Sequence, residues 1–524
     1  MHEISVHAAV VTRSVRAEKE DRLETQDIIA AMRSWIENVA FVPAAYDRYA
    51  PLVVDGLLFF LGRLPQSRLE AIVVDQMALA EDAGADERLI ALLRQCPTLH
   101  KLGQVVARQA GLPLELRLRL QGLESLAPVP GGYDFDAIVA RELGTVPGLR
   151  VGRDALAEGS VAFVVPFEWQ PRSAAPAQRG VFKALKPNAK ERLLEDLAIW
   201  PDLGDYLEER SRSLGLATLD FRALLDGVAR LLRNEIRLDR EQDRLERARR
   251  FFGNSPNVVI PELFPFCTPR LTAMQRIDGV KVSDPSVAPA LRRRLAETIV
   301  SALLAKPFWT AAAANPFFHA DPHAGNLFAM PDGKLAVFDW ALTTELSNAQ
   351  MAAVVRALLC AAALDEPGVV GALGVLGAVE READLRAAVV AALADVRHGT
   401  FPGFGWLTPL LDELGRSGTL AFPEEMALFR KSLLTLTGVI HDVWPNASID
   451  RVLIVGGSRQ FVSELWVRPL APLQSRVFGT HLSSEDLLRI MSTLAWAPAR
   501  HLLGTGCDAL GLTAPRILSG FSER

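Results

Sequence analysis

The sequence has few cysteines and no long apolar run. Its four cysteines, Cys96, Cys267, Cys360 and Cys507, are too far apart for a short-spaced zinc knuckle or a dense disulfide framework. Its apolar stretches end, or meet a charge, well before the ~20 residues that a membrane-spanning helix needs. The first residues lack the apolar core of a secretory signal. We therefore expect a cytoplasmic protein without a transmembrane helix, and leave open a peripheral contact with the inner face of a membrane.

A concentrated basic surface is also missing from the sequence. The formal net charge is -5, and acidic residues flank the short basic clusters, so nucleic acid is not an expected partner. Apolar residues make up 49% of the chain and charged residues 23%, which is the composition of folded globular proteins. A chain of 524 residues has room for two to four domains at ~100 to 200 residues each.

The apolar pattern changes several times along the chain. Residues 25–95 and 99–126 show the three- and four-residue spacing of amphipathic helices. Two β-prone runs follow, at 160–167 and 181–185. The pattern then predicts a long charged helix over 224–252, β-prone residues from 257 to 274, helices after 284, a loop-strand-loop at 319–339, and an all-helical remainder from 348. This order predicts an α+β, mostly helical fold with one small β-containing lobe.

The residues from Phe317 to Trp340 carry the most informative polar spacing. Asp321 is followed by Asn326 five residues later and by Asp339 at the end of a predicted strand. In phosphoryl transfer of the kinase kind, one carboxylate orients the nucleophile, while an amide oxygen and a second carboxylate hold Mg²⁺ against the nucleotide phosphates. A tight turn at Asp332-Gly333 would return the chain into that strand. We interpret Asp321 as catalytic and Asn326 and Asp339 as Mg²⁺ ligands; the alternative is a polar turn beside a buried strand.

His319 and His323 are four residues apart and raise the alternative of a zinc site. Pro322 between them opposes a continuous helix, and the glutamate of the H-E-x-x-H pattern is absent. Hydrogen bonding within the loop is the favoured interpretation of both histidines.

A cation for the nucleotide phosphates is expected on the second predicted strand. Lys183 has the position of the lysine in a V-A-I-K strand, and Glu241, on the charged helix, is its expected partner. Upstream, a run of small residues suits a backbone that approaches phosphates. Its candidate nucleotide-binding members are Ala157, Gly159, Ser160, Val161 and Ala162.

With these motifs together, the chain resembles the UbiB/AarF family of atypical protein-kinase-like proteins from about residue 97 to residue 346. Lys101, Gly103 and Gln104 are similar to the K-x-G-Q signature of that family, and Glu235 to the first acid of its E-x-D motif. The resemblance implies that the K-x-G-Q helices cover the mouth of the active site and regulate it. It also implies that Met274, beside the hinge, contacts the nucleotide, and that ATP and Mg²⁺ are the cofactors.

Four positions depart from the family pattern. Arg237 replaces the second acid of E-x-D, Glu158-Gly159 interrupts the alanine run, Trp340 follows Asp339 where D-F-G is usual, and Gln275 occupies a hinge position that is usually acidic. These departures leave regulation and substrate open.

The resemblance implies a bilobal kinase-like fold with helical extensions. We expect a helical region at 1–95, the K-x-G-Q segment at 96–145, an N-lobe at 146–280, a C-lobe at 281–400 and a helical region at 401–524. The expected function is a Mg²⁺-dependent ATPase or small-molecule or lipid kinase that supports isoprenoid quinone biosynthesis, with a quinone-precursor lipid as a candidate partner. An aminoglycoside-type phosphotransferase and a nucleotide-binding scaffold that is not an enzyme stay open as alternatives. The phosphoryl acceptor and the oligomeric state are not predicted.

Overall fold

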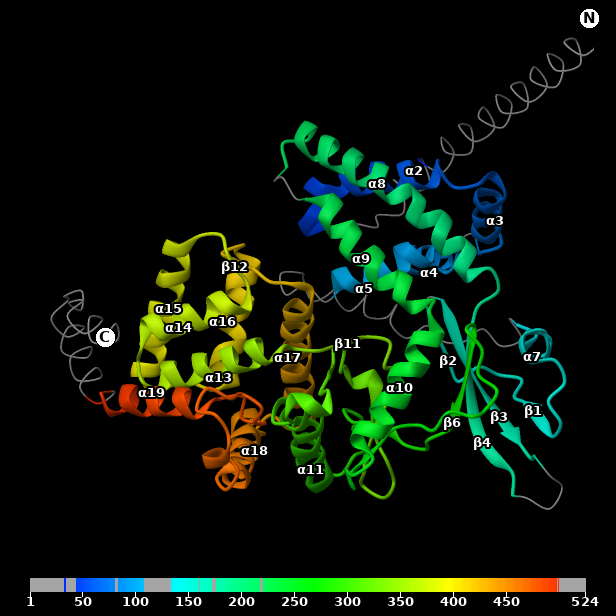
Figure 1. Cartoon of the computed structure of the whole chain (residues 1–524). Helices are drawn as coiled ribbons and strands as arrows, with labels where there is room; N and C mark the ends of the chain where they lie inside the picture. Colours follow the sequence, from blue (N-terminus) through cyan, green and yellow to red (C-terminus); the bar gives the residue numbers. More distant parts are fainter. Residues whose placement is uncertain are drawn as a thin grey trace, which may run out of the picture. The chain divides into compact units, whose positions relative to one another are not determined.

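The computed structural model describes residues 33, 44–80, 83–107, 133–159, 161–171, 176–216, 220–496 and 498. The chain forms two compact units (Figure 1): the first comprises Met1–Arg240 with Leu263–Arg276, and the second comprises Glu241–Glu262 with Ile277–Arg524. The five domain ranges expected above stay predictions. The fold is α+β and mostly helical, as the sequence predicts.

The first unit combines a helical layer with an antiparallel sheet. Its elements are η1 (Ala44–Tyr49), α2 (Ala50–Leu61), α3 (Gln66–Met77), α4 (Ala85–Gln95), α5 (Pro97–Ala107), α7 (Phe135–Leu143), α8 (Ala189–Ser213), α9 (Phe221–Glu235), β1 (Leu149–Val151), β2 (Ala157–Glu158), β3 (Ala162–Trp169), β4 (Gln178–Leu185) and β6 (Leu271–Gln275). The strand order is β1-β3-β4-β6, and β2 pairs with β3. The predicted pair of β-prone runs is thus confirmed as β3 and β4.

An aromatic core supports one face of this sheet. Phe163 and Phe167 from β3 and Phe182 from β4 are buried, and the rings of Phe167 and Phe182 stack with centroids 4.2 Å apart. Side chains alternate between the two faces of a strand, so Lys183 turns away from Phe182. In the sheet register Lys183 lies between Val164 and Thr272.

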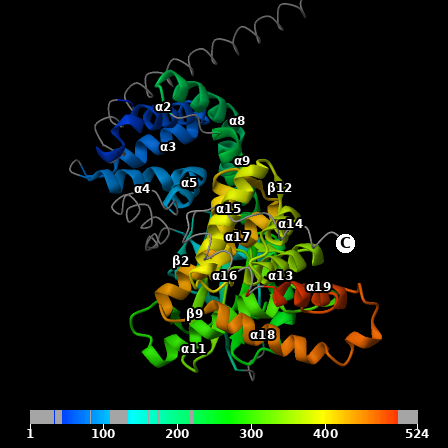
Figure 2. The same ribbon diagram turned by 90° about the vertical axis from the view of Figure 1, so that its left-hand side faces the viewer.

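The helices of the first unit share a second core. Helices α2 to α5 gather beside α8 in Figures 1 and 2, and α5 packs on both α8 and α9. The buried members of this core include Leu61, Leu69, Leu193 and Leu232, and also Val161 and Ala162 at the start of β3. The candidates Val161 and Ala162 therefore rest on the same apolar core as α5.

The second unit holds a small mixed sheet within a large helical body. Its elements are β5 (Val258–Val259), β7 (Val280–Lys281), α11 (Pro289–Val300), η3 (Ser301–Ala305), α12 (Lys306–Phe308), η4 (Ala312–Ala314), β8 (Phe318–His319), η5 (Ala324–Asn326), β9 (Leu327–Ala329), β10 (Leu335–Val337), β11 (Thr343–Thr344), α13 (Asn348–Ala362), α14 (Glu366–Leu376), β12 (Ala378–Val379), α15 (Glu382–Arg397), α16 (Phe404–Arg416), β13 (Leu420–Ala421), α17 (Glu424–Val443), α18 (Ile449–Glu464), η6 (Arg468–Leu470) and α19 (Ser484–Ala495). The strand order of its main sheet is β5-β10-β9-β7. Helix α17 packs against α11, which lies below it in Figure 1.

Two sequence-based expectations are wrong in detail. The helix expected over 224–252 is broken into α9 and α10 (Leu238–Phe252). Helix α9 ends at Glu235 and α10 begins at Leu238, and between them the N–H of Arg237 donates to the carbonyl of Asn234 at 3.1 Å in a turn. The remainder after Asn348 is not all helical, because β12 and β13 pair with each other. Part of the helical stretch predicted over 99–126 lies outside the described residues.

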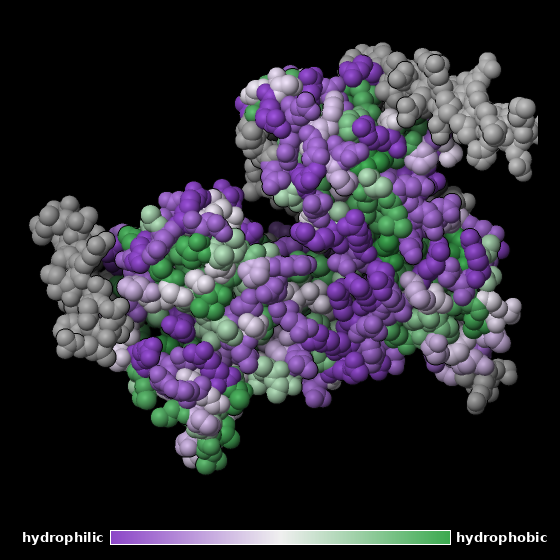
Figure 3. Space-filling model, turned by 45° about the horizontal axis from the view of Figure 1, so that its top comes forward, coloured by the Kyte–Doolittle hydropathy of each residue, from purple (hydrophilic) through white to green (hydrophobic). Residues whose placement is uncertain are grey.

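The surface of the C-terminal part of the second unit exposes large apolar side chains. Trp466 is 87% exposed and Leu470 is 86% exposed. Figure 3 shows green side chains at the surface of the lower left projection, where α18 lies in Figure 1. Among the described helices none is both long and apolar enough to cross a membrane.

Candidate active site

The loop that carries Asp321 is held by the buried imidazole of His319. The backbone N–H of Asp321 donates to His319 Nδ1 at 3.2 Å, so the ring proton lies on Nε2, which donates to the carbonyl of Phe338 at 3.0 Å. Burial lowers the pKa of His319, which keeps the ring neutral and able to accept the first bond. Both ring nitrogens of His319 therefore serve the loop.

His323 also makes a bond within the loop. Its Nδ1 accepts the backbone N–H of Gly325 at 3.1 Å. Within the described residues, no group of three or more His, Cys, Asp or Glu side chains is arranged to hold a metal ion. The favoured interpretation of His319 and His323, as hydrogen-bonding groups within the loop, agrees with this geometry.

Asn326 connects the catalytic loop to the segment that ends at Asp339. Its Nδ2 donates to the carbonyl of Asp321 at 3.2 Å, and its own carbonyl accepts the N–H of Phe338 at 2.9 Å. Asn326 is buried. Its side-chain nitrogen makes the bond to Asp321, and the oxygen is the other atom of the same amide group. An amide oxygen and a carboxylate are ligand types that Mg²⁺ accepts, so the residues present fit the ion.

Strand β10, which leads to Asp339, follows the predicted tight turn at Asp332-Gly333. Strands β9 and β10 pair antiparallel, with Val337 opposite Leu327. Asp332 Oδ1 accepts the N–H of Lys334 at 3.1 Å, and Gly333 has a φ of 83°, a conformation that glycine adopts without steric cost. The hairpin places the two expected metal ligands at one end of a rigid element.

Asp339 itself has a left-handed backbone. Its φ is 52°, a region that a few per cent of non-glycine residues occupy and in which Asp is enriched. Its Oδ1 accepts the N–H of Ala341 at 3.2 Å, a bond that supports the turn. Unusual backbone conformations cluster at functional sites, which is consistent with the role expected for Asp339.

Trp340, the residue after Asp339, is held by aromatic contacts. Its side chain is fully buried. Its ring centroid lies 4.8 Å from that of His319, 5.8 Å from that of Phe252 and 5.7 Å from that of Phe317. Trp340 stands where D-F-G has phenylalanine, so a larger ring system makes the aromatic contacts beneath the loop. The position of Asp339 in the pattern is unchanged.

In the first unit, the described nucleotide-loop candidates lie on or between the paired strands β2 and β3. Ala157 lies opposite Val164, and the N–H of Gly159 donates to the carbonyl of Ala162 at 2.8 Å. Ser160 lies outside the described residues. Glu158, which interrupts the alanine run, is buried and pairs with Lys186 at 2.7 Å, so the interruption ties the hairpin to the end of β4.

The K-x-G-Q helix reaches the E-x-D position directly. Lys101 of α5 forms an ion pair with Glu235 at the end of α9, and both side chains are largely enclosed, at 21% and 24% exposure. Arg237, the departure from the second acid, instead binds Asp239 through two guanidinium nitrogens at 2.9 and 2.7 Å. The residues expected to regulate the site are thus linked to each other; Gly103 and Gln104 lie on α5.

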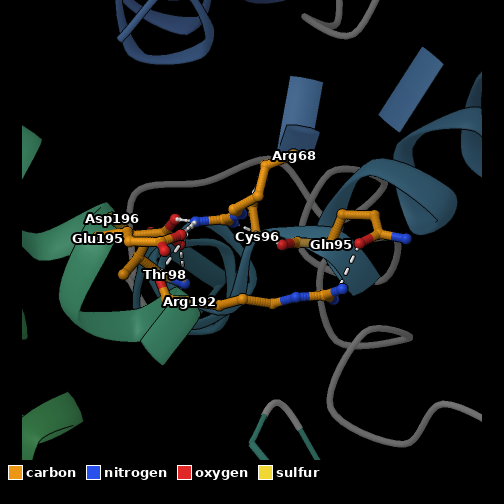
Figure 4. A network of polar contacts seen from close by, with 7 residues as sticks. All are labelled: Arg68, Gln95, Cys96, Thr98, Arg192, Glu195 and Asp196. Carbon is orange, nitrogen blue, oxygen red and sulfur yellow. Dashed lines mark hydrogen bonds and ion pairs between the residues drawn. The ribbon is translucent and has the colours of Figure 1, made fainter. Parts of the chain in front are cut away.

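A buried polar network fixes the position of α5 (Figure 4). Arg68 donates to Asp196 and, at 2.7 Å, to the carbonyl of Gln95. Thr98, at the start of α5, donates to the other oxygen of Asp196 at 2.8 Å. Arg192 donates to Gln95 Oε1 at 2.9 Å. One carboxylate on α8 therefore joins α3 and α5.

Three further expected residues, Met274, Lys183 and Glu241, are described within their own units. Met274 is buried in β6 opposite Val181, and Gln275 follows it. Lys183 belongs to the first unit and Glu241, which is buried, to the second, so their expected ion pair stays a prediction.

The sequence pattern did not indicate two residues of α17 that contact the catalytic loop. Lys431 Nζ lies 3.1 Å from Asp321 Oδ1, and Ser432 Oγ donates to the carbonyl of His319 at 2.8 Å. No local spacing connects them to the loop, because they are more than a hundred residues further along the chain.

Comparison with known proteins finds one domain family. Residues 175–373 match the ABC1 atypical kinase-like domain, a range that includes Lys183, Asp321, Asn326 and Asp339. Lys101 and all of α17 lie outside it.

Similar whole proteins cover only part of this chain. "Protein ACTIVITY OF BC1 COMPLEX KINASE 1, chloroplastic" of Arabidopsis thaliana is 25% identical over 366 residues, 67% of this chain and 52% of that protein. "Probable protein kinase UbiB" of Actinobacillus pleuropneumoniae is 28% identical over 253 residues, 46% of this chain and 45% of that protein. The chain thus spans about half the length of these relatives. Among solved structures, the Rv3197–erythromycin complex from Mycobacterium tuberculosis aligns with 72% of this chain and 95% of that chain, at 15% identity and a TM-score of 0.45.

Proposed function

Because the chain belongs to the UbiB/ABC1 family of atypical kinase-like proteins, we propose that it is a Mg·ATP-dependent ATPase or small-molecule or lipid kinase. One observation carries the proposal. Asp321, Asn326 and Asp339 belong to two segments that share hydrogen bonds through Asn326, His319 and Phe338. Phosphoryl transfer depends mainly on positioning and electrostatic stabilisation, and this loop pair supplies both.

Each residue has a separate task in this proposal. Asp321 orients the attacking hydroxyl or water, and Asn326 and Asp339 hold the metal ion. Bound Mg²⁺ would neutralise charge on the β- and γ-phosphates. Lys183 contacts the α- and β-phosphates and is held by Glu241. The hairpin from Ala157 to Ala162 and the buried Met274 form the nucleotide pocket.

The ion pair between Lys101 and Glu235 supports a regulatory role for α5. Because α5 packs on the same core as Val161 and Ala162, a movement of the helix would change the support of the nucleotide loop. A covered site would exclude a folded protein substrate, so the acceptor in this proposal is water, a small molecule or a lipid. Support of isoprenoid quinone biosynthesis is proposed from the family resemblance.

The surface of the second unit supports a peripheral membrane contact. A groove of about 930 Å³ is lined by Arg293 and Arg294 of α11 and by Arg451 and Arg459 of α18. Beside it, α18 and the segment after it expose apolar side chains, among them Val462 and Trp466. Arginine next to exposed tryptophan and aliphatic side chains suits the interface of an anionic membrane.

Turnover of Mg·ATP by the purified chain tests the proposal. The wild type is measured with and without vesicles of phosphatidylglycerol and a phenolic quinone precursor, alongside Asp339→Asn and Lys183→Ala. We expect Asp339→Asn to lower turnover by at least ~100-fold. Asp332→Asn, which changes an exposed carboxylate in the turn of the same hairpin, is the matched control and should retain activity.

Calorimetric binding of ATP separates the alternatives. A wild type that binds ATP but hydrolyses or transfers no faster than Asp339→Asn in every condition would identify a nucleotide-binding scaffold. Transfer to an aminoglycoside, with none to water or to a lipid phenol, would favour the phosphotransferase alternative. Absence of ATP binding would contradict both the enzyme and the scaffold.

A further inference from the structure

Two consecutive residues of α17 hold the catalytic loop from outside the matched kinase-like domain. Ser432 Oγ donates to the carbonyl of His319 at 2.8 Å, and Lys431 Nζ pairs with Asp321 Oδ1 at 3.1 Å. The Ser432 bond is buried, and the Lys431 and Asp321 side chains are 33% and 22% exposed. Helix α17 thus binds both the backbone carbonyl of His319 and the carboxylate of Asp321.

The packing of α17 fixes which of its residues face the loop. Met426, Phe429, Leu433 and Leu436 are buried and recur at the three- and four-residue spacing of one helix face. The Phe429 ring meets the Phe318 ring edge-on at 4.8 Å. The contact with Phe318 of β8 therefore fixes the rotation of α17 about its own axis.

The N-terminus of α17 is held by further contacts, outside the stretch from Asp321 to Leu327. Glu425 Oε1 accepts the Gln350 side chain at 3.0 Å, and its carbonyl accepts the Thr344 hydroxyl at 2.9 Å. Both partners follow Asp339 in the chain. The helix is a fixed support on which Lys431 and Ser432 meet the loop.

The catalytic loop has no cation of its own. From Asp321 to Leu327 the sequence is DPHAGNL, without Lys or Arg, and His323 uses Nδ1 to accept the N–H of Gly325. Lys431 of α17 supplies a cation beside Asp321.

We propose that Lys431 is a positioning residue of the phosphoryl-transfer site, and that α17 is a functional part of that site. The inference rests on the proposed function. In the reaction the nucleophile oxygen forms a bond to the γ-phosphorus as the bond from that phosphorus to the β–γ bridging oxygen breaks, and the nucleophile proton passes to Asp321. By binding one carboxylate oxygen, Lys431 fixes the plane of the group that orients the nucleophile.

The test compares Lys431→Met and Lys431→Arg with Lys334→Met in the full-length chain. Lys334 is the matched control, because it forms an exposed ion pair with Asp332 at 2.8 Å in the same unit. For Lys431→Met we expect kcat for ATP turnover to fall ~10- to 100-fold, while the KM and Kd for ATP change less than about twofold. Lys431→Arg keeps the charge and should recover most of the loss.

The split between kcat and KM, together with the recovery in Lys431→Arg, supplies a readout that a purely structural role would not move. An unchanged kcat in Lys431→Met, matching Lys334→Met, overturns the inference while the proposed function stands. A loss of kcat that Lys431→Arg shows in full also overturns the inference. A loss of kcat that is accompanied by loss of ATP binding does the same. A wild type no faster than Asp339→Asn overturns the proposed function and the inference together.

Discussion

The imidazole of His319 and the carbonyl of Phe338 are joined by a hydrogen bond of 3.0 Å. The bond ties the residue directly before Asp339 to the loop that carries Asp321, and it requires a neutral ring with its proton on Nε2. The geometry of the proposed catalytic and metal-binding residues therefore depends on the protonation of one buried histidine.

Stability should fall between pH 7 and pH 5 through His319. Burial lowers its pKa from the ordinary value of 6.5, so below that pH the unfolded ring takes up a proton that the folded ring does not. The stabilisation is present above pH 6.5 and is lost as the pH falls, by at most about 1.4 kcal/mol per pH unit for one group. Urea titrations across this range measure the slope.

A second buried histidine must be separated from the first. Burial also lowers the pKa of His481, which contributes a slope of the same sign. His319→Gln should therefore reduce the slope, and His319→Gln combined with His481→Gln should reduce it further. His398 is exposed, so His398→Gln serves as the control; an equal effect from all three single changes would refute the assignment.

The ion pair of Lys101 and Glu235 should stabilise the contact between α5 and α9. A double-mutant cycle of Lys101→Met and Glu235→Gln is expected to give a coupling of about 1 kcal/mol. Hydrogen exchange of the α5 amides should become faster in either single variant. The exposed pair of Arg237 and Asp239 is the control; a Lys101–Glu235 coupling no larger than in this pair would argue against the link.

The network around Asp196 should dominate the stability of the helical layer. Arg68→Met leaves a buried carboxylate without its cation, so we expect a loss of about 3 to 5 kcal/mol in the free energy of unfolding. Arg222→Gln, which breaks an exposed pair with Asp205, should cost below about 1 kcal/mol. Urea unfolding measures both, and similar losses in the two variants would show that the network contributes no more than a surface pair.

Membrane contact, if it uses the exposed apolar surface, should depend on Trp466 and Leu470. Trp466→Glu combined with Leu470→Glu removes apolar area and adds repulsion from anionic lipid, so binding to phosphatidylglycerol vesicles should weaken at least about tenfold. Sedimentation with vesicles measures this, and ATP turnover in solution should be unchanged. Leu224→Glu alters an exposed leucine of α9 in the first unit and should have no effect; retained binding in the double variant would exclude this surface.

The features that sequence reasoning predicted well are local in the chain. The turn at Asp332-Gly333 and the pairing of β3 with β4 each depend on residues close together in sequence, where turn chemistry and alternation are legible. The motif from His319 to Asp339 is similarly compact. Spacing alone was enough to predict that Asn326 and the Asp339 segment lie beside the Asp321 loop.

Contacts between distant residues could not be predicted in this way. Glu158 interrupts the small-residue run in sequence, yet in the fold it is the buried partner of Lys186. The break between α9 and α10 interrupts a stretch whose apolar and charged pattern predicts one helix. Lys431 belongs to a helix whose sequence resembles any amphipathic core helix, so its contact with Asp321 appears only in the folded chain.

The bond between Ser432 and His319 spans 113 residues, which has a consequence for synthesis. Ribosomes add roughly 5 to 20 residues per second, so the loop would wait roughly 6 to 23 seconds for its support. From the synthesis of Asp339 onward the nascent chain contains every residue proposed to bind ATP and Mg²⁺, but it still lacks the helix that orders Asp321. A newly made chain is therefore expected to acquire nucleotide binding before it acquires turnover.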